Sequence, residues 1–91
     1  MSDLDQARKA ISEIDQEMAR LFEKRMDVVR VVAEYKKTHG LPVEDLLREA
    51  DLIRENSALI EHEDYRSFYV DFLRHTIELS KRMQYGLMDE L

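Results

Sequence analysis

The sequence has no cysteine, a single proline, and only two glycines among its 91 residues. Without cysteine, the chain can form neither a disulfide framework nor a thiolate metal site. Gly40 and Gly86 are too few for a glycine-rich phosphate loop, and His39, His62 and His75 show no metal-ligand spacing. No apolar run approaches the ~20 residues of a membrane-spanning helix. We therefore expect no metal, no cofactor and no membrane span.

The charge of the chain also limits its partners. It carries 14 basic and 20 acidic residues, a formal net charge of -6, which argues against a nucleic-acid partner. An anionic small molecule could be bound only if cationic side chains were concentrated locally. The N-terminal residues 1–5 are acidic and lack the apolar run of a secretory signal, so we expect a cytoplasmic protein. The length suits one domain over residues 1–91.

The apolar periodicity predicts an all-α fold of three helices, one long, one short and one of medium length. The long helix covers residues 3–38 and ends where Gly40 can adopt a left-handed cap and Pro42 blocks continuation. The short helix covers residues 43–60, with Glu44 and Asp45 in its first turn. A break at residues 61–63 precedes the third helix, residues 64–87, and residues 88–91 are expected to fray.

One permanent cation interrupts the apolar face of the long helix. The face consists of two heptad rows, Leu4, Ile11, Met18, Arg25, Val32 and Ala7, Ile14, Leu21, Val28, Tyr35. We call these ten positions the seam. Arginine does not lose its proton to escape burial, so Arg25 needs an anion. The periodicity leaves open whether that anion is a side chain or a ligand.

The length of this helix predicts a second subunit. About 35 helical residues span roughly 50 Å, whereas a compact 91-residue globule has a radius of gyration of about 12 Å. Its own chain cannot cover the seam, so we expect an intertwined homodimer with antiparallel long helices. The alternative is a monomer in which this helix is broken, although residues 3–38 contain no Gly or Pro.

Polar residues also interrupt the third helix. Its apolar face follows the row Leu73, Ile77, Ser80, Gln84, Leu87, Leu91. Ser80 and Gln84 lie one turn apart in this row and, taken alone, suit a buried polar pair that fixes helix register.

Further charged residues could join Arg25. Lys36 lies three turns after Arg25 on the same face, whereas Arg8 is about 25 Å away along the axis. An antiparallel partner could bring its own Arg8 to the Arg25–Lys36 region. Alone, Arg8 and Lys36 would be interpreted as solvated flanking residues. Asp45, Arg48 and Glu49 share a face of the short helix and, alone, suit a surface ion pair.

No nucleophile with an adjacent base is evident, so these features alone would indicate a binding or structural module. The order Arg8, Arg25, Lys36, Asp45, Arg48, Glu49, Ser80, Gln84, however, resembles that of the all-helical (AroQ-type) chorismate mutases. The resemblance extends from about Leu4 to Gln84 and includes the strings Arg8–Asp15, Pro42–Glu49 and Ser80–Gln84. It implies a single chorismate mutase domain that converts chorismate, a dianion, to prephenate in phenylalanine and tyrosine biosynthesis.

The resemblance also implies a role for each residue. Arg25 and the partner protomer's Arg8 would bind substrate carboxylates, and Lys36 and Gln84 would donate to the ether oxygen. Glu49 and the Asp45 region would hold the ring hydroxyl, Ser80 would contact the ring carboxylate, and Arg48 would support that region. Arg25, Lys36 and Gln84 are thus the expected catalytic residues. The rearrangement is unimolecular, so it needs no nucleophile or metal.

Three other functions remain open at this stage. An isochorismate–pyruvate lyase would use a similar cationic site on a similar dianion. A regulatory module would bind chorismate or prephenate on behalf of a partner enzyme. A structural helical adaptor would bind no ligand and would not be stabilised thermally by prephenate.

Overall fold

The computed structural model describes residues 2–90 and consists of three α-helices without strands in that range. They are α1 (Asp3–Thr38), α2 (Leu46–Ser57) and α3 (Glu63–Glu90). The all-α prediction is therefore confirmed, including the order of long, short and medium helices. Leu91, the last member of the predicted α3 row, lies outside the described residues.

Both ends of α1 follow from local chemistry. The Ser2 hydroxyl accepts a hydrogen bond from the Asp5 backbone at 3.1 Å, and the Asp5 carboxylate accepts one from the Ser2 backbone at 3.4 Å, forming a capping box. At the other end, Gly40 adopts a φ of 65° and Leu41 N donates to the Lys36 carbonyl at 2.8 Å. The predicted left-handed cap at Gly40 is therefore confirmed.

The predicted bounds of the short helix were wrong at both ends. Residues 43–45 precede α2 because Asp45 is its N-cap: its carboxylate accepts from Arg48 N at 3.0 Å and its backbone is not helical. Helix α2 ends at Ser57 rather than at residue 60. Arg66 of α3 there donates to the carbonyls of Ser57, at 3.2 Å, and Ile60, at 2.8 Å.

The third helix is longer than predicted at both ends. It begins at Glu63, one residue early, with Glu63 and Asp64 in its first turn, where acidic side chains favour the helix dipole. It continues to Glu90, so the expected fraying of residues 88–91 is wrong for its described part. Lys37 of α1 donates to the Met88 carbonyl at 2.7 Å and thereby holds this end against α1.

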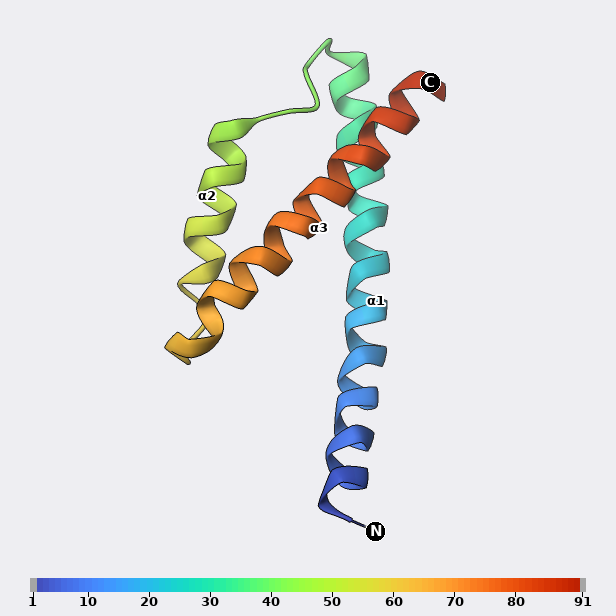
Figure 1. The fold of residues 1–91 in the computed structure, drawn as a ribbon. Coiled ribbons are helices and arrows are strands. Elements are labelled where there is room, and N and C mark those ends of the chain that lie inside the picture. The colour runs from blue at the N-terminus through green and yellow to red at the C-terminus, as the bar shows by residue number, and fades with distance from the viewer. Residues whose placement is uncertain (1, 91) are drawn as a thin grey trace.

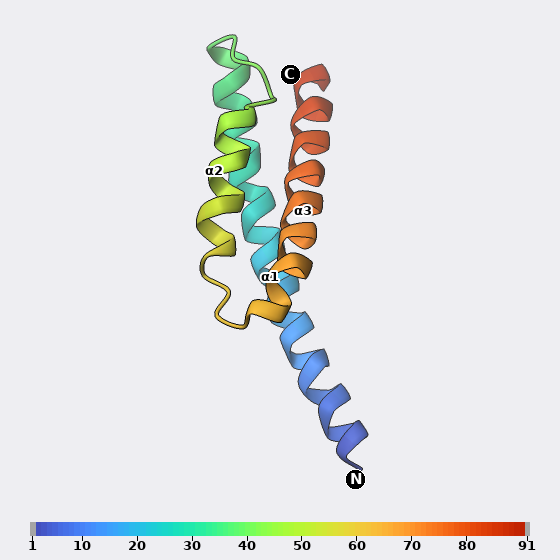
Figure 2. The ribbon, with the colours of Figure 1, turned by 60° about the vertical axis from the view of Figure 1, so that its left-hand side comes forward.

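The helices form an open, elongated arrangement. Helix α3 begins beside the end of α2 and crosses diagonally to the C-terminal end of α1 (Figure 1). The N-terminal half of α1, residues 3–20, projects away from the other two helices (Figures 1 and 2). The chain measures 55 × 27 × 14 Å and its radius of gyration is 16.5 Å. It is therefore more extended than a compact globule of this length, for which about 12 Å is expected.

The buried core is small and excludes the seam. The buried apolar side chains among residues 2–90 are Val29, Ala33, Val43, Leu73 and Ile77. Seam residues such as Ile11, Met18 and Leu21 are exposed. The accessible surface is 7348 Å², whereas a globular monomer of this mass exposes roughly 5,600 Å². None of the described helices is long and apolar enough to cross a membrane.

A candidate anion-binding pocket between the three helices

A pocket of about 170 Å³ lies where the C-terminal half of α1, α2 and α3 approach one another. Seven of the eight residues predicted from the sequence line it: Arg25, Lys36, Asp45, Arg48, Glu49, Ser80 and Gln84. The structure therefore brings together side chains that are up to 59 positions apart in the sequence. Apolar side chains, among them Val29, Leu52 and Ile77, complete the wall.

Arg25 faces Ser80 across the contact between α1 and α3. The Arg25 guanidinium donates to the Ser80 hydroxyl oxygen, and the same hydroxyl donates to the Thr76 carbonyl at 3.0 Å. Ser80 is only 5% exposed, and Arg25 is half-buried. A guanidinium has five N–H donors, so one hydroxyl partner leaves others available for an anion in the pocket.

Lys36 and Gln84 form a second polar pair. The Lys36 ammonium donates to the Gln84 Oε1 at 3.0 Å and to the Val43 carbonyl at 2.7 Å. An ammonium has three donors, so one remains for a ligand. Because an ammonium can only donate, the Gln84 carbonyl oxygen must face it, and the amide nitrogen is the donor that remains. Gln84 is buried, with 6% of its surface exposed, so this pair is held in a water-poor environment.

The structure does not support the simple interpretation of Asp45, Arg48 and Glu49 as a surface ion pair. Asp45 uses its carboxylate to cap α2, and Arg48 forms no ion pair within residues 2–90. Glu49 pairs instead with Lys81 of α3, at 2.8 Å. All three side chains nevertheless line the pocket, so a ligand could meet each of them.

Lys81 also lines the pocket, although it was not among the residues predicted from the sequence. Its ammonium lies among Glu49, Glu44 and Glu78. The hydrogen bond to Glu49 is the largest cause that raises the pKa of Lys81 above its ordinary value, while burial acts in the opposite direction. The ammonium is therefore charged at neutral pH. A sequence signal existed, because Lys81 lies four residues after Ile77 and three before Gln84, on the same helix face.

Arg8 is the predicted site residue that does not reach the pocket of its own chain. It lies on the exposed N-terminal half of α1, 17 residues before Arg25. Because α1 is unbroken between them, a rise of 1.5 Å per residue puts Arg8 about 25 Å from Arg25 along the helix axis. The pocket of one chain therefore contains the other seven predicted residues but not Arg8.

The charges of the pocket suit a small anion. Four cationic side chains, Arg25, Lys36, Arg48 and Lys81, and two anionic ones, Asp45 and Glu49, give the lining a net charge of +2 within a chain of net charge -6. The residues that line it include no thiol or histidine. Its chemistry is therefore hydrogen-bond donation and charge stabilisation.

The fold and this pocket define an all-α protein whose three helices line a small pocket of net positive charge. The sequence model of chorismate mutase type II matches residues 7–85, a segment that includes all eight predicted site residues. The chain belongs to the chorismate mutase type II family, which confirms the resemblance identified in the sequence. No curated protein and no solved structure matches the chain.

Proposed function

We propose that this protein converts chorismate to prephenate and acts as a homodimer. The observation that carries the proposal is that seven residues spaced as in the all-helical mutases line one cationic pocket, in a chain of the chorismate mutase type II family. The reaction breaks the ether C–O bond of chorismate and forms a C–C bond within the same molecule. No proton, electron or outside group is transferred, which suits a pocket whose polar groups are donors and fixed charges.

Binding would fix the two carboxylates of the substrate. Arg25, at the junction of α1 and α3, is placed to bind one of them, with bidentate geometry available to its guanidinium. Arg8 of a second copy would supply the other cation, and Arg48 would add positive charge on the α2 side. Ser80 would donate once its hydroxyl turns away from the Thr76 carbonyl. Fixing both ends of the substrate favours the folded, chair-like geometry from which it reacts.

Lys36 and Gln84 would stabilise the transition state. Negative charge grows on the ether oxygen as the C–O bond breaks. A hydrogen bond to that oxygen that is stronger in the transition state than in the ground state lowers the barrier. Each of these two side chains has a donor that their mutual hydrogen bond leaves unused. Their bond also orients both groups before substrate arrives, so little reorganisation is needed during reaction.

Asp45 and Glu49 would hold the ring hydroxyl. The Glu49 Oε2 atom is buried and has no hydrogen-bond partner within residues 2–90, so it can accept from a hydroxyl in the pocket. Asp45 lies at the start of α2, where capping engages its Oδ1 atom. The protein would thus offer carboxylates to the substrate's hydroxyl and cations to the substrate's carboxylates. This arrangement would allow the substrate to bind in only one orientation.

The homodimer is proposed because of the exposed surface of α1. The chain exposes roughly 1,800 Å² more than a globular monomer of its mass, and a large dimer interface buries 1,000 Å² or more per subunit. The seam residues on residues 3–20 are apolar and exposed, so covering them with a second α1 would be favourable. An antiparallel arrangement centred near Met18 would bring Arg8 of one chain beside residues 28–29 of the other.

The test is the loss of chorismate absorbance on addition of the protein, with identification of the product. We expect prephenate; salicylate and pyruvate from isochorismate would instead indicate a lyase. Lys36→Ala should lower kcat/KM by about 10²–10³-fold, the usual effect of removing one transition-state donor. Lys37→Ala is the matched control, because Lys37 is exposed and its side chain bonds, within residues 2–90, to the Met88 carbonyl alone. No conversion by the wild-type dimer would refute the proposal.

A further inference from the structure

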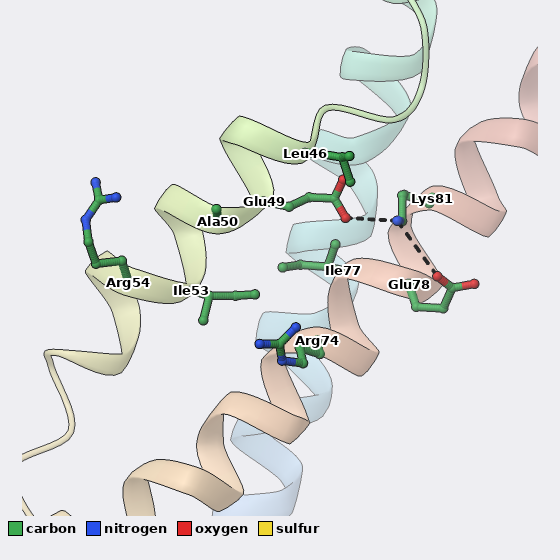
Figure 3. A pocket seen from close by; sticks show the side chains of 9 residues that line it. All are labelled: Leu46, Glu49, Ala50, Ile53, Arg54, Arg74, Ile77, Glu78 and Lys81. Carbon is green, nitrogen blue, oxygen red and sulfur yellow. Dashed lines mark ion pairs between the residues drawn. The ribbon is translucent and has the colours of Figure 1, made fainter.

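Glu49 and Lys81 form the most enclosed ion pair among the described residues. Figure 3 shows Glu49 reaching from α2 towards Lys81 on α3, with the ion pair drawn between them. The Nζ–Oε1 distance is 2.8 Å, and the two side chains are 20% and 19% exposed. Both residues line the pocket and also a groove of about 540 Å³ between α2 and α3.

The two oxygens of Glu49 differ in their surroundings. Oε1 accepts from Lys81, whereas Oε2 is buried without a partner in residues 2–90. A buried carboxylate oxygen without a donor is unfavourable, and a donor on a ligand would relieve that cost. The hydrogen bond to Oε1 fixes the direction of the carboxylate and leaves Oε2 as the remaining acceptor.

Lys81 prefers Glu49 to its other acidic neighbours. Glu44 and Glu78 lie 3.8 and 4.0 Å from its Nζ, and both side chains are about half exposed. Exposed ion pairs at such distances are weak because water screens them. The hydrogen-bonded partner at 2.8 Å is therefore the one that determines where the ammonium lies.

Other cations could compete for Glu49 if Lys81 were absent. Arg74 of α3 and Arg54 of α2 line the same groove (Figure 3), and neither lines the pocket. Arg54 is already paired with Asp51 at 2.8 Å, whereas Arg74 forms no ion pair in the described chain. Loss of Lys81 would leave Glu49 free to turn towards Arg74 and away from the pocket.

We propose that Lys81 is a positioning residue that acts through Glu49, holding the carboxylate so that Oε2 receives the ring hydroxyl of the substrate. The inference rests on the function proposed above and adds a residue to it. Lys81 directs its ammonium at Glu49 rather than at the substrate. Its loss should therefore have the same consequence as loss of the Glu49 carboxylate.

A double-mutant cycle tests this dependence. Lys81→Met, Glu49→Gln and the double variant are compared by kcat and KM for chorismate. Each single change should lower kcat/KM by roughly 10- to 100-fold, because a misplaced contact costs that much. The double variant should be no slower than Glu49→Gln alone, since two residues that act as one unit are not additive. Arg82→Met is the matched control, because Arg82 is exposed and its nearest ion pair is with Glu78 at 3.6 Å.

A chorismate analogue without the ring hydroxyl provides a second readout. The ratio of kcat/KM between wild type and Lys81→Met should be much smaller for this analogue than for chorismate. Without the ring hydroxyl, the Glu49 Oε2 atom has no hydrogen bond to accept from the substrate. A merely structural role would slow both compounds equally. Lys81→Gln retains a donor for Glu49 and should recover part of the rate, and it replaces Lys81→Met if thermal unfolding shows that the latter does not fold.

The outcomes separate the two proposals. If wild type neither converts nor binds chorismate, the proposed function fails and the role of Lys81 fails with it. If wild type is active but Lys81→Met slows Glu49→Gln by a further tenfold, Lys81 acts independently of Glu49 and only the role of Lys81 is overturned. That role is equally overturned if Lys81→Met is as fast as Arg82→Met.

Discussion

The two halves of α1 have the same apolar pattern but different surroundings. In residues 21–38, Val29 and Ala33 are buried against α3, and Arg25 and Lys36 line the pocket. In residues 3–20, every residue is exposed. The same repeat of apolar positions therefore occurs both in a packed half and in a half that stays exposed among the described residues.

The difference shows that most of the repeat is not buried within residues 2–90. The buried residues Val29 and Ala33 are not seam positions, whereas Val28 and Val32 of the seam remain exposed beside them. Helix α1 therefore has two apolar faces: a short one used by α3 and a long one that continues along its whole length. A second copy that covers the long face would account for both halves together. Four predictions follow, one for the pocket of the packed half and three for the second copy.

The largest effect should come from the packed half and its partner α3. Gln84→Glu replaces the neutral donor beside Lys36 with a carboxyl that donates only when protonated. The ordinary pKa of a glutamic acid side chain is about 4.3, so the carboxyl loses its donor as pH rises through that value. The ionised oxygen would then repel the negative charge that grows on the ether oxygen. We expect kcat/KM near pH 8 to fall by about 10²–10³-fold, with partial recovery towards pH 5. A variant with equal activity at pH 5 and pH 8 would contradict the role of Gln84 at the ether oxygen.

The next effect should come from the exposed half. Ile14→Lys places a charge in the seam. If the proposed dimer forms through this face, the variant should be a monomer, measured by sedimentation. The pocket would retain its own seven residues but lose the second copy's Arg8, and activity should fall roughly 10- to 100-fold, the worth of one charge-assisted contact. Gln16→Lys adds the same residue on the opposite face and should leave both assembly and activity unchanged. An Ile14→Lys monomer with wild-type activity would contradict this account, because the exposed half of α1 would then not be needed for activity.

A smaller effect is expected when two inactive variants are combined, because the mixture should be only about fourfold less active than wild type. Arg8→Ala and Arg25→Ala chains, unfolded and reassembled together, would place one intact site in each mixed dimer. With random pairing, about a quarter of wild-type activity should return, since half of the dimers are mixed and each has one of two sites. Confirmed mixed dimers without activity would contradict a site shared between two chains.

The smallest effect concerns the first turn of α1. Ser2→Ala removes the capping box and costs about 1 kcal/mol, which lowers Tm by roughly 4–8 °C if this turn unfolds together with the rest of the protein. Ser12→Ala, in the exposed middle of the same half, should cause no loss because alanine is the better helix former. No change in Tm for Ser2→Ala would mean that residues 3–20 unfold independently and are not covered by a second copy.

Much of the fold could be predicted because it depends on local chemistry. The bounds of α1 follow from Gly40, Pro42 and an uninterrupted apolar repeat, and all were predicted correctly. The bounds of α2 could not be predicted, because they depend on contacts with distant residues. Lys36 holds the Val43 carbonyl, and Arg66 holds the carbonyls at the end of α2. The apolar periodicity of a sequence gives no information about such long-range hydrogen bonds.

The candidate site divides in the same way. Arg25, Ser80 and Gln84 were recognisable because polar residues are conspicuous in apolar rows, and the order of eight residues gave the resemblance. Lys81 could not be singled out because a lysine three residues after Glu78 resembles an ordinary surface ion pair. Its importance depends on Glu49, 32 positions earlier, which packing alone brings within 2.8 Å. The assembly and the roles of the site residues remain predictions for the experiments above.

The bond between Lys36 and the Val43 carbonyl also determines which changes the α1–α2 connection can tolerate. The acceptor is a backbone atom, so a substitution at position 43 leaves the hydrogen bond itself available. Adding or removing a residue between positions 39 and 45 would instead move the carbonyl away from Lys36 and turn that lysine out of the pocket. Variants of this protein should therefore accept many side chains in the connection but only one length.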